Sequence, residues 1–450
     1  MKKELSFNEF DKVSAAAWKQ KIQVDLKGAD YNETLVWKSP DGIDVKPFYH
    51  NDESSSPFSP ISGQPQHWNI GQAIFIDDVA IANQLATDAL NRGAEALFFT
   101  ATSAFDIDAL LQNLIDKANK IYFDLKFLSP SFSKDKSFHH KNIVVLNDSI
   151  HHHTQDGNWF TNMKTDFEDL KTIFKSTNTL AVDVAHYQNA GATNVQQLAY
   201  ALAHANEYFN ALQEHLSPTT TVVFKVAIGS NYFFEIAKIR ALRLVYNSLA
   251  KEYNLNGICH IAAMPTKRNK TLYDYNVNML RTTTECMSAI IGGADTICNQ
   301  PYDAIYHKSN EFGERISRNQ LLLLKHESYF DSVTNAADGV YYIEQLTTQL
   351  TEKALSVFKE IERGGGFLQQ LKEGVIQKKI KESAAKEQAA FDKGEKVLLG
   401  TNKHPNKDDK MKHDLELFPF VKKNPRKTHI EPIIEKRLAE VVEQERLNNE

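Results

Sequence analysis

The chain has 450 residues, more than a single hydrophobic core usually serves, so we expect one large domain with extensions, or two domains. Hydrophobic residues make up 42% and charged residues 24%, which is ordinary for a globular protein and excludes a disordered or fibrous class. The net charge of -5 gives no reason to expect nucleic acid or a membrane as partner, and no apolar run approaches the ~20 residues that cross a bilayer.

The amino-terminal segment MKKELSFNEFDKVSAAAW has two lysines but no continuous apolar core after them, so it is not a secretory signal. The three cysteines, Cys259, Cys286 and Cys298, have no CxxC pairing, and their odd number argues against a disulfide framework. These features predict a cytoplasmic protein.

Residues 1–69 are irregular and contain Trp18, Trp37, a turn at Asp41–Asp44 and a Ser/Pro/Gln-rich run. This composition predicts an extended amino-terminal arm rather than a self-contained core. The apolar residues of the arm still need a surface to bury against. That surface is either a second subunit or the arm's own barrel, and the sequence favours neither.

From Gly71 onward, short β-rich runs alternate with helix-length amphipathic runs, which is typical of a parallel sheet covered by helices. The strand candidates are 73–78, 96–100, 120–125, 142–148, 180–185, 222–229, 257–264 and 294–300. They favour an α/β fold, a (β/α)8 TIM-type barrel over residues 70–337, rather than an open doubly wound sheet. Residues 338–450 read as a helical carboxyl-terminal extension that ends in a charged tail.

The weakest part of this alternation is 139–165, which is rich in histidine and shows no clear helix. His151–His153 form a run there, with His139 and His140 nearby. A metal site usually needs three or four protein ligands, and no HExxH motif or matched Cys/His pair occurs. We therefore predict a polar loop between barrel elements and no metal site.

His186 follows the predicted strand LAVDVA directly, within the motif DVAHYQNAGA. Barrel enzymes place reactive groups at the carboxyl ends of their strands. An imidazole at this rim can donate a hydrogen bond to a carbonyl oxygen and stabilise charge that develops on it. A histidine held by backbone groups at a strand end is the more common alternative.

The block Tyr273–Asn319 contains a long amphipathic helix, a Gly-Gly break, a short apolar strand, a polar loop and the start of another helix. It resembles the closing units of the barrel in the methylmalonyl-CoA mutase family of adenosylcobalamin-dependent isomerases. The resemblance covers roughly residues 12–400 and is also specific in the His186 loop, in the helix from Tyr232 and in 393–403. The arm pattern from Trp18 to Tyr49 is similar to the small-subunit type in particular.

Catalytic members of this family carry an Arg-Gln-Tyr-Ala-Gly segment before the first strand, and its tyrosine contacts the substrate carboxylate. This chain has PFSPISGQPQHWNIGQ there. Catalytic members also carry Arg-Thr-Gln-Thr-Ser-Gly-Trp after the seventh strand. Here GICHI leads into AAMPTKRNKTLYDYN, and neither Lys267 nor Arg268 is equivalent by position. His186 keeps the family position that faces the thioester carbonyl, so we predict a vestigial pocket with no catalytic residue, its candidates being His186, Tyr187, Gln188 and Asn231.

Families that bind cobalamin with its lower base displaced use an Asp-x-His-x-x-Gly motif, whose histidine becomes the cobalt ligand. No such motif occurs in this sequence, because DVAH at 183–186 has the wrong spacing. We therefore expect no cobalamin-binding domain and no cofactor bound by this chain alone.

The resemblance implies a structural small subunit in a heterodimeric mutase. Its partner would be a large catalytic subunit that holds adenosylcobalamin and the acyl-CoA substrate, and that interconverts (R)-methylmalonyl-CoA and succinyl-CoA by a radical route. Two alternatives stay open. The chain could be an active acyl-CoA mutase barrel that works with a separate cobalamin-binding polypeptide, or a stand-alone acyl-CoA-binding protein.

Overall fold

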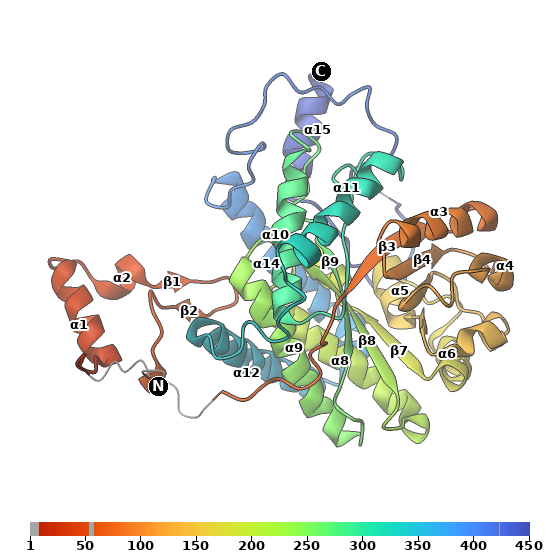
Figure 1. Cartoon of the computed structure of the whole chain (residues 1–450), viewed down its shortest axis with the longest axis horizontal. Helices are drawn as coiled ribbons and strands as arrows, with labels where there is room; N and C mark the ends of the chain where they lie inside the picture. Colours follow the sequence, from red (N-terminus) through yellow and green to blue (C-terminus); the bar gives the residue numbers. More distant parts are fainter. Residues whose placement is uncertain (1–8, 54–57, 423) are drawn as a thin grey trace, which may run out of the picture.

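The computed structural model describes residues 9–53, 58–422 and 424–450, and its centre is an eight-stranded parallel sheet that curls into a ring (Figure 1). The strands are β3 (Asn69–Phe75), β4 (Ala96–Ala101), β5 (Lys120–Leu125), β6 (Ile143–Leu146), β7 (Thr179–Asp183), β8 (Thr221–Ile228), β9 (His260–Pro265) and β10 (Thr296–Cys298). Neighbours in the sheet run in the order β6-β5-β4-β3-β10-β9-β8-β7. The predicted TIM-type barrel is confirmed, and each predicted strand overlaps one of these.

The ring is nearly closed, and the gap in its ladder lies between β6 and β7, the two ends of the strand order. A side chain bridges this seam. Asp148, two residues after β6, accepts a hydrogen bond from the backbone N–H of Asp183 on β7 at 2.8 Å. The barrel is therefore completed by a carboxylate where its strands do not pair.

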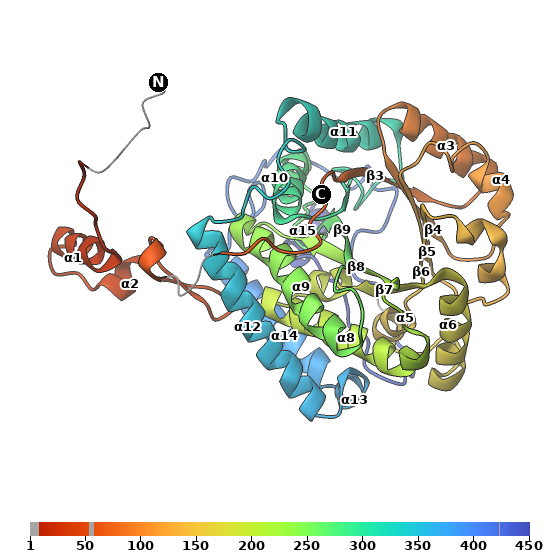
Figure 2. The same ribbon diagram turned by 60° about the horizontal axis from the view of Figure 1, so that its bottom comes forward.

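Helices cover the outside of the ring (Figure 2). They are α3 (Val79–Asn91), α4 (Ile107–Leu111), α6 (Met163–Thr177), α8 (Asn194–Leu212), α9 (Tyr232–Glu252), α10 (Val277–Gly292) and α11 (Glu311–Leu322). Two shorter helices, α5 (Ser149–Asp156) and α7 (Ala185–Asn189), lie at the carboxyl ends of β6 and β7. The helices α8, α10 and α12 (Tyr341–Arg363) pack against α9, so even the side chain of its Arg240 is fully buried. Arg240 forms ion pairs with Asp338 and, at 2.6 Å, with Glu344.

The polar loop predicted around His151–His153 is wrong, because these residues lie in α5. Asp148 caps the amino end of this helix, and Gly157 ends it in the left-handed conformation with φ 86°. His151 and His153 are buried. Their side chains pack against neighbouring elements instead of facing solvent, as in the stacking of His153 on Trp159 with ring centroids 4.1 Å apart.

Both faces of the strands are buried, which explains their nearly continuous apolar sequences. The outward face of one half of the ring packs against α3 and α4 through residues such as Leu97, Phe99 and Phe123. The inward face forms a separate cluster of Ala96, Phe98, Tyr122, Val144, Leu146, Ala181, Val223, Ala262 and Cys298. These residues alternate with the outward ones along each strand, so they fill the lumen of the barrel.

The amino-terminal residues form α1 (Ala15–Asp25), α2 (Tyr31–Leu35) and a hairpin of β1 (Trp37–Lys38) and β2 (Asp44–Val45). The hairpin is fixed to the barrel, because Asp41 in its turn accepts a hydrogen bond from the backbone N–H of Val195 at the start of α8, at 2.9 Å. By contrast, α1 has no buried residue, and both views show it standing away from the barrel helices (Figures 1 and 2). Residues 1–8 and 54–57 of the predicted arm lie outside the described residues.

After the barrel come α12, α13 (Phe367–Lys372) and α14 (Val375–Asp392), and the chain ends with α15 (Glu440–Asn448). Residues 424–439, which lack regular structure, connect back to the carboxyl-terminal rim of the barrel. None of the helices in the described ranges is long and apolar enough to cross a membrane.

Candidate functional site

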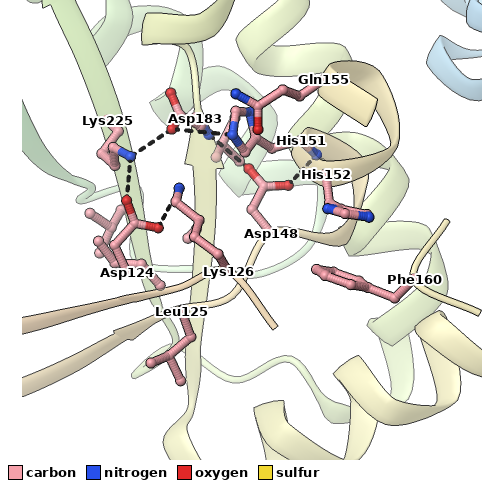
Figure 3. A pocket seen from close by; sticks show the side chains of 14 residues that line it. Asp124, Leu125, Lys126, Asp148, His151, His152, Gln155, Phe160, Asp183 and Lys225 are labelled. Carbon is pink, nitrogen blue, oxygen red and sulfur yellow. Dashed lines mark hydrogen bonds and ion pairs between the residues drawn. The ribbon is translucent and has the colours of Figure 1, made fainter. Parts of the chain in front are cut away.

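A cavity of about 280 Å³ opens at the carboxyl ends of β5, β6, β7 and β8 (Figure 3). It is lined by Asp124, Leu125, Lys126, Leu146, Asp148, His151, His152, Gln155, Phe160, Ala181, Val182, Asp183, Val223 and Lys225. This is the rim at which barrel enzymes carry their functional groups. The cavity is therefore the natural place to look for a site.

A charge cluster forms the floor of the cavity, and all its members come from inward-facing positions near the strand ends. Lys225 of β8 lies between two carboxylates, 2.8 Å from Asp124 Oδ2 on β5 and 2.6 Å from Asp183 Oδ2 on β7. Lys126 adds a second cation 2.8 Å from Asp124 Oδ1. Burial alone would raise the pKa of Asp183, but Lys225 and His151 hold the pKa of its carboxyl well below the ordinary value. The same two carboxylates keep Lys225 charged by raising its pKa despite its burial.

Asp148 is the polar centre of the seam beside this cluster. Its carboxylate caps the backbone N–H of His151 at 2.8 Å, accepts from His204 Nε2 at 2.9 Å and from the Tyr208 hydroxyl at 2.7 Å, and bridges to Asp183 as described above. Burial acts to raise the pKa of Asp148, but the neighbouring donors, His204 foremost, lower it to about 2. Asp148 is thus an ionised, well-satisfied structural carboxylate.

His151 is the imidazole that the cavity presents most directly. Burial lowers its pKa to about 4, so the ring is neutral at physiological pH. Its Nε2 stands 3.9 Å from Asp183 Oδ2, and its Nδ1 has no hydrogen-bond partner. The ring of His151 meets the ring of His186 edge-on, with centroids 5.0 Å apart.

The structure places the predicted His186 on the short helix α7, directly after β7, with 1% of its surface exposed. Its Nδ1 is 3.1 Å from Glu435 Oε1, and its Nε2 has no partner. His186 does not line the cavity itself. It reaches the cavity only through its contact with His151.

The other three candidates lie in different surroundings. Tyr187 is fully buried, and its hydroxyl is 2.9 Å from His204 Nδ1, so it joins the Asp148 network. Gln188 is buried under the loop after β8, where its amide oxygen, in the orientation that satisfies both of its ends, accepts from the Gly229 N–H at 3.1 Å. Asn231 is exposed at the start of α9 and caps no N–H of that helix. The use of these four side chains as a pocket stays a prediction.

Sequence reasoning missed the residues that do line the cavity, although a signal for them exists. Asp124, Asp183 and Lys225 are charged residues inside otherwise apolar strand sequences, KIYFDL, LAVDVA and VVFKVAIG. A charge in a strand that is buried on both faces has to be paired. In a closed barrel the carboxyl ends of all the strands meet at one rim. The positions of Asp124, Asp183 and Lys225 near their strand ends therefore predict a common charge cluster there.

A segment of the carboxyl-terminal tail covers this rim, and we call residues 428–438 the strap. Its backbone N–H groups donate to carbonyl groups that follow three different barrel strands: Ile430 to Gly157 at 3.0 Å, Ile433 to Thr154 at 2.8 Å, Lys436 to Asn189 at 3.1 Å and Leu438 to Arg268 at 2.9 Å. Arg268 also returns a hydrogen bond from its guanidinium to the Lys436 carbonyl at 2.7 Å. The strap is therefore fixed across the mouth next to His186.

Within the described ranges, no group of three or more His, Cys, Asp or Glu side chains is arranged to hold a metal ion. The cavity's charged groups are also largely engaged with one another, as Figure 3 shows for Asp124, Asp183 and Lys225. These ion pairs join the carboxyl ends of β5, β7 and β8.

Comparison with known proteins shows the family to which the chain is similar. The family model described as methylmalonyl-CoA mutase matches residues 144–448. A methylmalonyl-CoA mutase small subunit from Porphyromonas gingivalis is 33% identical over 90% of this chain and 72% of its own length, and one from Streptomyces virginiae is 26% identical over 85% and 67%. A methylmalonyl-CoA mutase large subunit from Streptomyces virginiae is 32% identical over 50% of this chain, a match that covers 32% of that subunit.

Proposed function

The chain belongs to the methylmalonyl-CoA mutase family, and we propose that within it this protein is a small subunit that supports a large catalytic subunit. The proposed complex interconverts (R)-methylmalonyl-CoA and succinyl-CoA with adenosylcobalamin on the large subunit. This proposal is supported by the two proteins named as small subunits, which match 90% and 85% of this chain.

The observation that carries the proposal is the filled lumen. Phe98 stacks on Tyr122 with ring centroids 4.1 Å apart, and the Tyr122 hydroxyl is 2.8 Å from Thr296 Oγ1. Burial raises the pKa of this phenol well above its usual range, so it stays neutral. Apolar and aromatic side chains thus fill the lumen except for the cavity of about 280 Å³ at its carboxyl-terminal rim, which is below the ~300–1,000 Å³ of typical small-molecule sites and small for an acyl-CoA.

The residues at the mouth do not fit adenosylcobalamin. The strap covers the carboxyl-terminal rim, and the imidazole that the strap contacts, His186, is fully enclosed and bound to Glu435. We therefore assign the cofactor and the acyl-CoA substrate to the partner subunit. In this proposal, this chain binds neither of them.

The arm supplies the partner contact in this proposal. Trp18 and Val24 on α1 are 45% and 68% exposed, although both side chains are apolar. We propose that residues 1–69 act as an arm that buries these side chains against the large subunit, with 70–337 as the barrel and 338–450 as the extension. All three cysteines are buried free thiols, which supports a cytoplasmic location.

Trp18→Ala is expected to weaken binding to the large subunit by about 30-fold, because large aromatic side chains dominate protein interfaces. The melting temperature of the isolated chain should change little, since α1 has no buried residue and the substitution removes one partly exposed contact, the stacking of Trp18 on Phe48. Titration calorimetry with the purified large subunit measures the affinity. Leu280→Ala, which removes a 66% exposed side chain from α10, is the matched control and should leave binding unchanged.

A reconstitution experiment tests the function itself. This chain alone, given adenosylcobalamin and methylmalonyl-CoA, should show no turnover, and addition of the large subunit should give a stable complex with full activity. Turnover with a stand-alone cobalamin-binding polypeptide would instead identify an active barrel subunit. Binding of acyl-CoA by a chain that forms no complex would identify a free acyl-CoA-binding protein.

A further inference from the structure

Glu435 at the centre of the strap holds the mouth closed through one side chain. Its Oε1 is 3.1 Å from His186 Nδ1, and its Oε2 is 4.0 Å from Lys267 Nζ. Burial works to raise the pKa of Glu435, but the hydrogen bond from His186 and the charge of Lys267 hold that pKa below the ordinary value. The Glu435 carboxylate thus lies between the imidazole of His186 and the ammonium group of Lys267 at the rim.

We propose that His186 and Lys267 form a binding site for a small carboxylate, which the Glu435 side chain occupies as an internal ligand, so that the strap and a free carboxylate compete for the mouth of the barrel. This site goes beyond the supporting role proposed above and does not depend on it. It concerns an equilibrium between a closed strap and a released one within this chain.

Three observations support the competition. First, the His186 side chain is built into the barrel and completely covered, whereas 28% of the Glu435 side chain is exposed, so the Glu435 side chain is the part that can leave. Second, the backbone around Glu435 has no helix or ladder, and its neighbours Ile434 and Lys436 are exposed, so this stretch can open between the buried anchors Ile433 and Arg437. Third, the Lys267 side chain is 60% exposed with its Nζ 4.0 Å from Glu435 Oε2, so an ammonium group at the mouth is open to an incoming carboxylate.

Hydrogen–deuterium exchange tests the first half of the proposal, because the amides of Ile430, Ile433, Lys436 and Leu438 are the donors that fix the strap. Glu435→Ala should raise their exchange rates about tenfold, the loss expected for one charge-assisted hydrogen bond. Glu435→Gln keeps the shape without the charge and should give an intermediate increase. Glu445→Ala, at an exposed glutamate of α15, is the matched control and should change nothing. Unchanged strap exchange in Glu435→Ala would overturn the proposal.

Chemical rescue tests the second half. Sodium acetate added to Glu435→Ala should raise its melting temperature and slow exchange of the rim amides around His186, while the neutral isostere acetamide and sodium chloride at equal ionic strength should not. Wild-type protein should respond only at much higher acetate concentration, because acetate has to displace Glu435 from the site. An equal response in both proteins would place acetate elsewhere. No response in the variant would show that the site does not take a free carboxylate. Either result would contradict the proposal.

Discussion

Replacing Asp148 with Asn should lower the free energy of unfolding by about 3 kcal/mol or more, which makes it one of the most damaging single changes in the barrel. Asn keeps one acceptor oxygen, so its NH2 group would face either the Asp183 N–H, which now donates to Oδ2, or the donors on Oδ1, among them the Tyr208 hydroxyl. In either orientation at least one enclosed donor would be left without an acceptor. Chemical denaturation with a fixed m-value measures the loss as a lower midpoint.

The same variant has a pH signature. Folding holds the pKa of Asp148 at about 2, below the ~3.9 of an unfolded aspartate, so the carboxylate stabilises the folded state at pH values above ~3.9. That contribution is lost as the pH falls toward 2. The stability difference between wild type and Asp148→Asn should therefore shrink as the pH is lowered from about 5, and a constant difference would contradict this account.

Asp78→Asn is the matched control for Asp148. Asp78 also caps a helix, accepting from the Ile81 N–H of α3 at 2.9 Å, but it is exposed. Asn caps a helix nearly as well as Asp, so this change should cost less than about 1 kcal/mol. A similar loss in both variants would show that Asp148 acts as an ordinary cap rather than as the bridge between β6 and β7.

The barrel could be predicted because each strand carries its own local signal. A run such as VVFKVAIG is short, β-rich and bounded by polar residues, and eight such runs in alternation with helices leave few architectures. The helix α5 was missed because histidines lowered the apparent periodicity. Its end signals were nevertheless present, as Asp148 at the amino end and Gly157 at the carboxyl end.

The site could not be predicted in the same way because its contacts are not local. Glu435 and His186 lie 249 residues apart, and nothing in the sequence around either one indicates the other. His186 was singled out by its place after a strand, and it does lie at the rim. What surrounds it is set by the path of the tail, which has no regular structure and therefore no periodicity to detect.

The seam and the charge cluster together fix the shape of the barrel at its carboxyl-terminal rim, where Asp124, Asp183 and Lys225 satisfy one another. Such a cluster selects one register of the strands, because the charges meet only when β5, β7 and β8 are aligned. The charge cluster thus supports the structural role proposed for this chain.

Lys225→Met tests that role and should cost about 3–5 kcal/mol at neutral pH, because it leaves Asp124 and Asp183 facing each other without their shared cation. Loss of this cation would raise both folded-state pKa values, and the pKa of Asp183 more than that of Asp124, which keeps Lys126 at 2.8 Å. A raised acid pKa destabilises the fold as the pH increases, so the deficit should be largest near neutrality and should diminish below about pH 4. Asp183→Asn in the Lys225→Met background removes one of the two charges and should recover part of the loss. Lys21→Met, which breaks an exposed pair with Asp25, should change stability by less than about 0.5 kcal/mol, so an equally small effect at Lys225 would mean that the cluster does not hold the strands.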